Sequence, residues 1–245
     1  MDNTLLVGLS AQQVLRQRLD VSANNLANMD TVGFKAEALV NREIEEKPAR
    51  VTERPSDVVF VDAWALQRDM SVGPIERTGN PLDVAIEGDG FFAIESPGGE
   101  PVYTRDGRFS IDGDGRLVTR SGLLVLGEGD APIQTDPEAG PVKISQDGAI
   151  GQGDAEIGRF KLVDFQTSGA LEKIGDGLLK ATVEEPGPPE TIRLAQGFVE
   201  GSNVQAIGEM TRLIEISRAY EGVSRMLNQS NQLREKAVDK LARVG

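Results

Sequence analysis

The stretch that decides the fold lies near the C-terminus, where residues 203–243 read NVQAIGEMTRLIEISRAYEGVSRMLNQSNQLREKAVDKLAR. Apolar or small side chains recur at alternating steps of three and four residues, at Ala206, Met210, Leu213, Tyr220, Leu227, Val238 and Leu241. Polar side chains hold the seam positions between them, at Ser217, Ser224, Asn231 and Arg234. This spacing predicts one helix with a heptad-like seam, starting at a capping box formed by Ser202 and Gln205. At full length it would extend about 60 Å, which is typical of a coiled coil or bundle.

The N-terminal segment shows a shorter version of the same pattern. Residues 3–29 lack proline, and apolar side chains follow one three–four register at Leu5, Leu15, Leu19, Leu26 and Met29. Gly8, Gln12 and Ser22 hold the intervening positions, while Val14 and Val21 lie off the stripe. Because a lone amphipathic helix is marginal in water, we expect the terminal helices to pair in a coiled-coil-like bundle or to await neighbouring subunits.

The interior reads as short strands separated by turns. Twenty-eight glycines, most of them in this region, suit many tight turns. Candidate strands are 58–61, 82–86, 91–94, 102–105, 108–111, 116–119, 123–126, 142–144, 159–165, 178–181 and 192–196. Asp106-Gly107 predicts a tight hairpin between two of them, and Asp112-Gly113-Asp114-Gly115 predicts another turn. The fold class is therefore predicted as α+β, with a central all-β domain inserted between the N- and C-terminal helices.

Three regions follow from this pattern. Residues 1–35 and 202–245 are expected to form a terminal helical domain, and residues 81–201 a β-rich domain. Residues 36–80, with Pro48, Pro55 and Pro74, are expected to be an extended connecting segment.

The composition excludes several kinds of function. The chain has 245 residues and a formal net charge of −13, which disfavours nucleic acid and anionic membranes as partners. It contains neither cysteine nor histidine, so thiol nucleophiles, a Ser-His-Asp triad and His-ligated metals are impossible. No stretch is apolar enough for a transmembrane helix, and the N-terminus lacks the pattern of a cleaved secretory signal.

Three motifs suggest a ligand site and fail on inspection. Counted from Asp112 as a calcium loop, the fifth position is Arg116 and the twelfth is Leu123, neither of which is the required ligand. Asp83 and Asp89 resemble a glycosidase pair only in residue type, since the chain has one Trp and two Tyr and thus no clustered aromatic platform for a sugar. Gly88-Asp89-Gly90 lacks the third glycine of a dinucleotide fingerprint. We expect no catalytic residue, cofactor or metal.

Four blocks of sequence resemble one family. They are ANNLAN at residues 23–28 with Thr31 and Gly33-Phe34-Lys35, TGNPLDVAIEGDGFF at residues 78–92, YTRDGRF at residues 103–109, and GFVEGSNV at residues 197–204 followed by Glu209-Met210 and residues 218–221. Together they are similar to the flagellar rod and hook axial proteins. Within that family, the short region between Lys35 and Thr78 resembles the proximal-rod type. A distal-rod or hook-type subunit is the alternative.

The resemblance implies a structural subunit and no enzyme. Such proteins leave the cytoplasm through the flagellar type III export apparatus without a cleaved signal. They assemble in the periplasm as a helical tube of rod subunits, with the terminal helices inside, and transmit torque for motility. The implied partners are other rod subunits, further copies of the chain and the export apparatus, with no nucleic acid and no small-molecule substrate. The alternative from another class is a secreted carbohydrate-binding or hydrolytic β domain.

Pattern and resemblance together suggest the residues of the subunit interface. They are Leu15, Leu19, Asn24, Asn25, Leu26 and Asn28 near the first helix, and Met210, Leu213, Ser217, Tyr220, Ser224 and Leu227 on the second. The structural turn and anchor residues are Thr31, Gly33, Phe34, Gly88, Gly90 and Gly107. Two plainer interpretations stay open: residues 24–35 as an ordinary helix end with a hydrophobic anchor, and the C-terminal helix packed only within its own chain.

Overall fold

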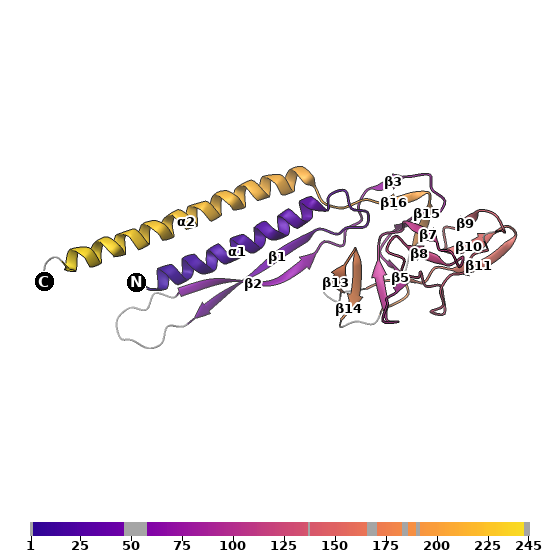
Figure 1. Cartoon of the computed structure of the whole chain (residues 1–245), viewed down its shortest axis with the longest axis horizontal. Coiled ribbons are helices and arrows are strands. Elements are labelled where there is room, and N and C mark those ends of the chain that lie inside the picture. Colours follow the sequence, from indigo (N-terminus) through magenta and orange to yellow (C-terminus); the bar gives the residue numbers. More distant parts are fainter. Residues whose placement is uncertain are drawn as a thin grey trace. The chain divides into compact units, whose positions relative to one another are not determined.

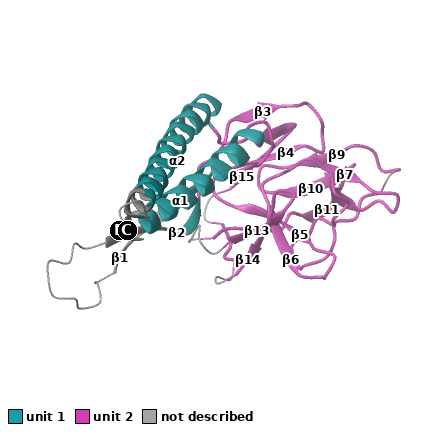
Figure 2. Cartoon of the chain, turned by 60° about the vertical axis from the view of Figure 1, so that its left-hand side comes forward, with its two compact units in different colours: residues 1–27, 37–67, 205–245 teal, residues 28–36, 68–204 magenta. Residues whose placement is uncertain are grey.

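The computed structural model describes residues 2–46, 58–136, 138–165, 171–182, 186–189 and 192–242. The chain forms two compact units, each built from segments far apart in the sequence (Figure 2). We call residues 1–27, 37–67 and 205–245 the helical unit, and residues 28–36 and 68–204 the β-rich unit. The predicted α+β class, with a strand-rich centre between two terminal helices, is confirmed.

The helical unit is built on two long helices that pack against each other. Helix α1 spans Asp2–Ala27 and helix α2 spans Ala206–Ala242, and they run antiparallel, so that the start of α1 and the end of α2 point the same way (Figure 1). The helices approach closely at Gly8, where an added Cβ would lie 2.6 Å from Leu227 Cδ2. Strands β1 (Glu37–Glu46) and β2 (Val58–Arg68) form a two-stranded sheet, and β1 packs against α1. No helix in the described residues is both long and apolar enough to span a membrane.

The seam of α2 differs from the expected register. The most buried side chains of α2 are Glu209 and Ile216, and the buried or half-buried three–four series runs through Glu209, Leu213, Ile216, Tyr220, Val223, Leu227 and Ser230. Leu213, Tyr220 and Leu227 belong to both registers, whereas the expected Met210 and Ser217 are exposed. The physical reason is that Ile216 and Val223 offer apolar surface one residue before the polar Ser217 and Ser224. The expected start also differs, because α2 begins at Ala206 while Ser202 Oγ accepts a hydrogen bond from Val204 N at 3.2 Å.

Helix α1 buries two faces. Its expected seam is half-buried at Leu5, Leu15, Leu19 and Leu26 and buried at Ser22. Its most buried apolar side chain is nevertheless Val14, off that stripe. The reason is that α1 packs on both α2 and β1, so a second face is covered as well.

The β-rich unit contains short antiparallel strands. A five-stranded sheet has the order β12-β5-β6-β14-β13, from Leu162–Val163, Phe91–Glu95, Pro101–Thr104, Leu178–Ala181 and Leu171–Gly175. A three-stranded sheet has the order β11-β10-β9, from Ala155–Arg159, Ala149–Gln152 and Val142–Ile144. Three pairs complete it: β7 (Phe109–Ile111) with β8 (Leu117–Thr119), β15 (Arg193–Gln196) with β4 (Val84–Glu87), and β16 (Phe198–Glu200) with β3 (Ile75–Arg77). The last two pairs place the first and last strands of this unit side by side.

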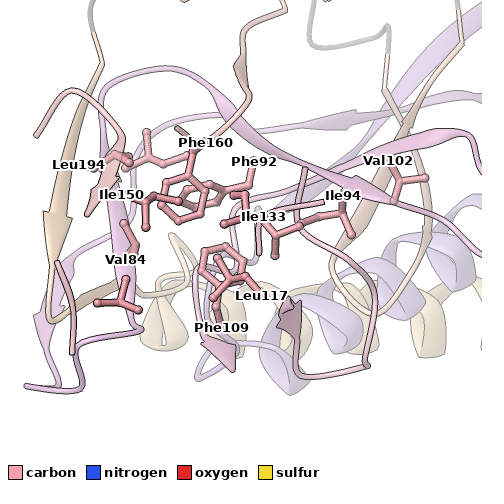
Figure 3. Close-up of a cluster of buried hydrophobic side chains, with 13 residues drawn as sticks. Val84, Phe92, Ile94, Val102, Phe109, Leu117, Ile133, Ile150, Phe160 and Leu194 are labelled. Carbon is pink, nitrogen blue, oxygen red and sulfur yellow. The ribbon is translucent and has the colours of Figure 1, made fainter. Parts of the chain in front are cut away.

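Strand β5 explains the position of the core. Its side chains alternate between two clusters, since successive residues of a strand point to opposite faces. Phe92 and Ile94 join the larger cluster (Figure 3), and Phe91 and Ala93 join the smaller one. The rings of Phe92 and Phe109 meet edge to face with centroids 5.1 Å apart. The continuous apolar run of 91–94 therefore marks a strand buried on both faces.

The prediction of a hairpin at Asp106-Gly107 is wrong. Strand β6 pairs with β5 and β14, and β7 pairs with β8, so the segments flanking Asp106-Gly107 do not pair with each other. Gly107 instead passes over the backbone of β4, and Val84 N donates to Gly107 O at 3.0 Å. The turn expected at residues 112–115 is confirmed as the connection of the β7–β8 hairpin.

The two units also differ from the three expected regions. Residues 28–36 belong to the β-rich unit, and residues 37–67, expected as a connecting segment, belong to the helical unit. The physical reason lies in local partners: residues 33–36 bond to the β-rich unit, while β1 lies along α1.

Candidate functional site

A buried carboxylate organises the point where four segments of the β-rich unit meet. Glu200, the last residue of β16, is 1% exposed. Its Oε1 accepts from Lys35 Nζ at 2.7 Å and from Gly73 N at 2.9 Å, and its Oε2 accepts from Arg105 Nη1 at 3.0 Å. We call Lys35, Arg105 and Glu200 the charge junction. Each buried charge needs its partner here, because unpaired charge in a protein interior is strongly unfavourable.

The two cations of the charge junction have further contacts. Lys35 Nζ also donates to Ser71 O at 2.6 Å, and the Arg105 guanidinium lies 5.1 Å from the ring centre of Phe91. Burial lowers the pKa of Lys35, and attraction to Glu200 opposes that shift. The arrangement holds two positive groups around one negative group in a largely dry site, so it suits a structural clamp.

Hydrogen bonds of backbone groups and of the Asn203 side chain hold the segment that follows α1 next to the charge junction. Gly33 N donates to Glu200 O at 2.7 Å, and Ala36 N donates to Asn203 Oδ1 at 2.7 Å. Asn203 Nδ2 donates to Asp69 O at 2.9 Å, and Asp69 N donates to Ala36 O at 2.8 Å. Residues 33–36, 69–73 and 200–203 are thereby held together inside the β-rich unit.

The helical unit carries a candidate contact surface of another kind. Ile207, Met210 and Ile214 of α2 are 81%, 45% and 54% exposed, and we call them the apolar stripe. At about 100° per residue, this stripe faces away from the Leu213–Ile216–Tyr220 side that packs against α1. A row of large apolar side chains that stay exposed to this degree indicates an interaction surface.

Comparison with known proteins identifies the family. A model described as "Flagella basal body rod protein" matches residues 5–35, one described as "Flagellar hook protein FlgE/F/G D1 domain" matches residues 85–152, and one described as "Flagellar basal body rod FlgEFG protein C-terminal" matches residues 195–240. The flagellar basal-body rod protein FlgF of Caulobacter vibrioides is 43% identical over 245 residues, covering 100% of both chains. The chain belongs to the flagellar basal-body rod protein family.

Other relatives show the range of this rod protein family. FlgF of Mesorhizobium japonicum is 39% identical over 98% of each chain. The rod protein FlgG of Caulobacter vibrioides is 35% identical, covering 94% of this chain and 95% of its own. The predicted family is confirmed, as is the predicted resemblance to its proximal-rod type, which is FlgF, and the family is structural rather than enzymatic.

The charge junction, with Phe91, brings together one residue from each of the four blocks. Lys35 comes from the first block, Phe91 from the second, Arg105 from the third and Glu200 from the fourth. Their side chains meet although Lys35 and Glu200 are 165 residues apart in the chain. The four blocks are recognisable in the sequence, but the junction that they form was not predicted from it. Lys35 follows Phe34 and Glu200 precedes Gly201 within their blocks, which was the available signal for those two residues, whereas Arg105 lies between Thr104 and Asp106 and had no such neighbour.

The predicted interface residues of this rod protein fall into several groups. Leu15, Leu19, Leu26, Leu213, Tyr220, Ser224 and Leu227 are half-buried in the helical unit, and Asn28 is half-buried in the β-rich unit. Asn24, Met210 and Ser217 are exposed. Much of the predicted seam therefore packs within one chain. Met210 is the predicted interface residue that belongs to the apolar stripe. Arg234, Val238 and Leu241 lie outside the residues whose side chains are described.

Asn25 corrects one of these predictions. It is 1% exposed, its Nδ2 donates to Glu37 O at 2.8 Å, and its Oδ1 accepts from Glu37 N at 2.9 Å. Asn25 thus completes the start of β1 within its own chain and is not available to a neighbour.

The predicted turn and anchor residues lie in the β-rich unit. Thr31 N donates to Asn28 O at 3.1 Å, and Phe34 is buried with Lys173 Nζ 4.7 Å from its ring centre. Gly88 and Gly90 have φ of 113° and 153° in the turn between β4 and β5. These positions agree with turn and anchor roles, except that Gly107 serves a close approach instead of a hairpin.

The acidic turn at residues 112–115 is held by internal bonds. Asp112 Oδ1 accepts from Arg116 N at 2.8 Å and from Asp114 N at 3.0 Å, while Arg116 Nη2 lies 2.8 Å from Asp114 Oδ2. The backbone bond from Arg116 is the main reason that the pKa of Asp112 is lowered. In the described part of the chain, no group of three Asp or Glu side chains is arranged to hold a metal ion.

Two glycines test how tightly the segment after α1 is seated. Gly33 and Gly79 have similar φ, 70° and 77°, but an added Cβ at Gly33 would lie 2.7 Å from Arg105 C and Asp106 N, whereas at Gly79 it meets nothing within 4 Å. Gly79→Ala should lower the free energy of unfolding by about 1–2 kcal/mol from the backbone conformation alone. Gly33→Ala should lower the free energy of unfolding by about a further 1–3 kcal/mol, because the added Cβ overpacks the site. Urea unfolding monitored by circular dichroism measures both, and equal losses would contradict a tight seat at Gly33.

Proposed function

We propose that this chain is a structural subunit of the rod of the bacterial flagellar basal body, and that it polymerises through the helical unit. The apolar stripe carries this proposal, because three large apolar side chains face solvent on a helix whose other side is already packed. Membership of the flagellar basal-body rod family supports it. The secreted carbohydrate-binding or hydrolytic alternative loses its support, because the family is structural.

We further propose the proximal part of the rod as its position. Relatives named FlgF are 37–43% identical over 98–100% of this chain, and relatives named FlgG are 30–35% identical over 94–98% of it. The difference favours the FlgF-type position over the distal one. Export through the flagellar type III pathway and assembly in the periplasm with other rod subunits are part of the same proposal, as is transmission of torque.

The division into units suits a load-bearing part. The chain passes between the helical unit and the β-rich unit four times, after residues 27, 36, 67 and 204. Segments next to each of these crossings bond to one another around Asn203 and Glu200 within the β-rich unit. Force that reaches the β-rich unit through any crossing is thus spread over several segments.

A substitution in the apolar stripe tests the proposed function. Ile214→Asp should leave the free energy of unfolding within about ±0.5 kcal/mol, because the side chain is exposed. It should remove about 1.5–3 kcal/mol from each subunit contact, a weakening of about tenfold to a hundredfold. We expect the variant, as the sole copy in the bacterium, to be missing from purified basal bodies and to abolish swimming in soft agar.

The matched control is Asn228→Asp, which adds the same charge at an exposed α2 position with no apolar side chain to lose. We expect it to swim and to be present in basal bodies. Full swimming of the Ile214→Asp strain, with the protein at its usual level in basal bodies, would refute polymerisation through this surface. Absence of the unmodified chain from basal bodies would refute the proposed function itself.

A further inference from the structure

A groove in the helical unit lies on a different side of α2 from the apolar stripe. It has a volume of about 410 Å³ and is formed by α1, β1 and α2, which lie side by side in Figure 1. Its apolar lining comes from Leu15, Val21, Ala38, Leu39, Ile216 and Ala219. The other lining residues, Arg18, Ser22, Glu37, Arg212 and Glu215, are polar or charged, so only part of the groove is apolar. The apolar part of a groove of this volume accommodates aliphatic side chains.

We infer that the apolar stripe of one copy of this chain binds in the groove of the next copy, in a contact between two different surfaces. The inference rests on the proposed function and names the partner surface of the same helix. One chain carries both a projecting apolar row, Ile207–Met210–Ile214, and a recessed groove with an apolar part, so each copy offers what its neighbour requires.

The charges around the two surfaces favour another copy as the occupant. The groove contains two arginines, Arg18 and Arg212, and two glutamates, Glu37 and Glu215, so its charges balance. The stripe carries no charge, and Glu209 between its members is buried and paired with Arg212. In a chain with a net charge of −13, most surfaces of two copies repel each other. Both surfaces of this contact are free of that repulsion.

The geometry favours growth over a closed pair. At about 100° per residue, the stripe and the α2 residues that line the groove are centred about 160° apart around the helix. A contact between two different surfaces of one protein is heterologous and propagates to further copies. Along α2, the two surfaces are centred about five residues apart, so parallel copies would be offset by about 8 Å per contact. The contact therefore builds a sideways array with a small rise.

Cysteine cross-linking tests this contact, because the chain has no cysteine of its own. Met210→Cys places a thiol in the stripe and Ala38→Cys places one in the groove, both at exposed positions. We expect basal bodies from cells that make both variants to yield a cross-linked dimer on mild oxidation. Cells that make only one of the variants should yield monomer. A second pair, Ile207→Cys with Ala219→Cys, should behave alike and guards against an effect peculiar to Met210.

Asn228→Cys with Ala38→Cys is the control pair, since Asn228 is exposed on α2 about two heptads beyond the stripe, and it should yield no dimer. A dimer from Met210→Cys alone would show a stripe-to-stripe contact and overturn the inference. The inference would also be overturned if both mixed pairs gave no dimer although immunoblots found the variants in basal bodies. In that case the proposed function would still stand. If neither the variants nor the unmodified chain were found in basal bodies, both the inferred contact and the proposed function would be overturned.

Discussion

Replacing Glu200 with alanine is expected to lower the free energy of unfolding of the β-rich unit by about 3–5 kcal/mol. The substitution leaves the charged groups of Lys35 and Arg105 buried without their shared partner, at exposed fractions of 5% and 3%. It also removes the acceptor of the Gly73 amide. Urea unfolding followed by far-ultraviolet circular dichroism measures the loss of stability. Glu87→Ala, at an exposed glutamate in β4, is the control and should change stability by less than about 0.5 kcal/mol.

A double substitution distinguishes the charge effect from a general packing effect. Glu200→Gln should be less damaging when Lys35 is already methionine, because one of the two stranded charges is then gone. A double-mutant cycle should show a coupling of about 0.5–3 kcal/mol between the positions. Simple additivity of the two single losses would contradict a charge junction.

The pH dependence gives a second readout for Glu200→Gln. Burial already lowers the pKa of Lys35 from 10.5, and removal of Glu200 takes away the attraction that opposes this shift. The unfolded chain then binds more protons than the folded chain between the lowered pKa and 10.5, so stability rises with pH in that window. We expect the loss caused by Glu200→Gln to shrink toward alkaline pH. A loss that is constant up to pH 10 would argue that Lys35 is not stranded.

Gly107→Ala is the second substitution with a large expected effect. An added Cβ would lie 1.8 Å from Val84 O and 3.2 Å from the Phe92 ring. Val84 and Phe92 both belong to the larger core cluster, and Val84 N is bonded to Gly107 O, so the backbones cannot separate without opening the core (Figure 3). We expect a loss of more than about 4 kcal/mol, with little soluble folded protein.

Gly113→Ala is its control, because an added Cβ there meets nothing within 4 Å and the position has no left-handed backbone. Its stability should stay within about 1 kcal/mol of the original chain. Expression yield and thermal unfolding of the two variants provide the comparison. A Gly107→Ala protein that unfolds at the same temperature as Gly113→Ala would show that the close approach to Val84 is not structurally important.

The sequence predicted what kind of surface the candidate site has, but not which residues form it. The sequence predicted that α2 bears a seam, yet the structure turns the packed side toward Ile216 and leaves Met210 exposed with Ile207 and Ile214. Both registers satisfy a three–four spacing, and only the partner surface on α1 and β1 decides between them. The apolar stripe was hidden for the same reason, since a periodic helix does not reveal which apolar row remains uncovered.

The sequence by itself determined two terminal helices, a strand-rich interior and several turns, because helical and strand periodicity and the backbone freedom of glycine are local properties. Residues 91–94 and 112–115 needed no distant partner to be interpreted. Only the tertiary structure decided that Asp106-Gly107 crosses β4 instead of closing a hairpin, and that Lys35 and Arg105 meet Glu200 across 165 and 95 residues of chain. Those outcomes depend on contacts between distant segments, where burial and charge pairing act together, and no local spacing encodes them.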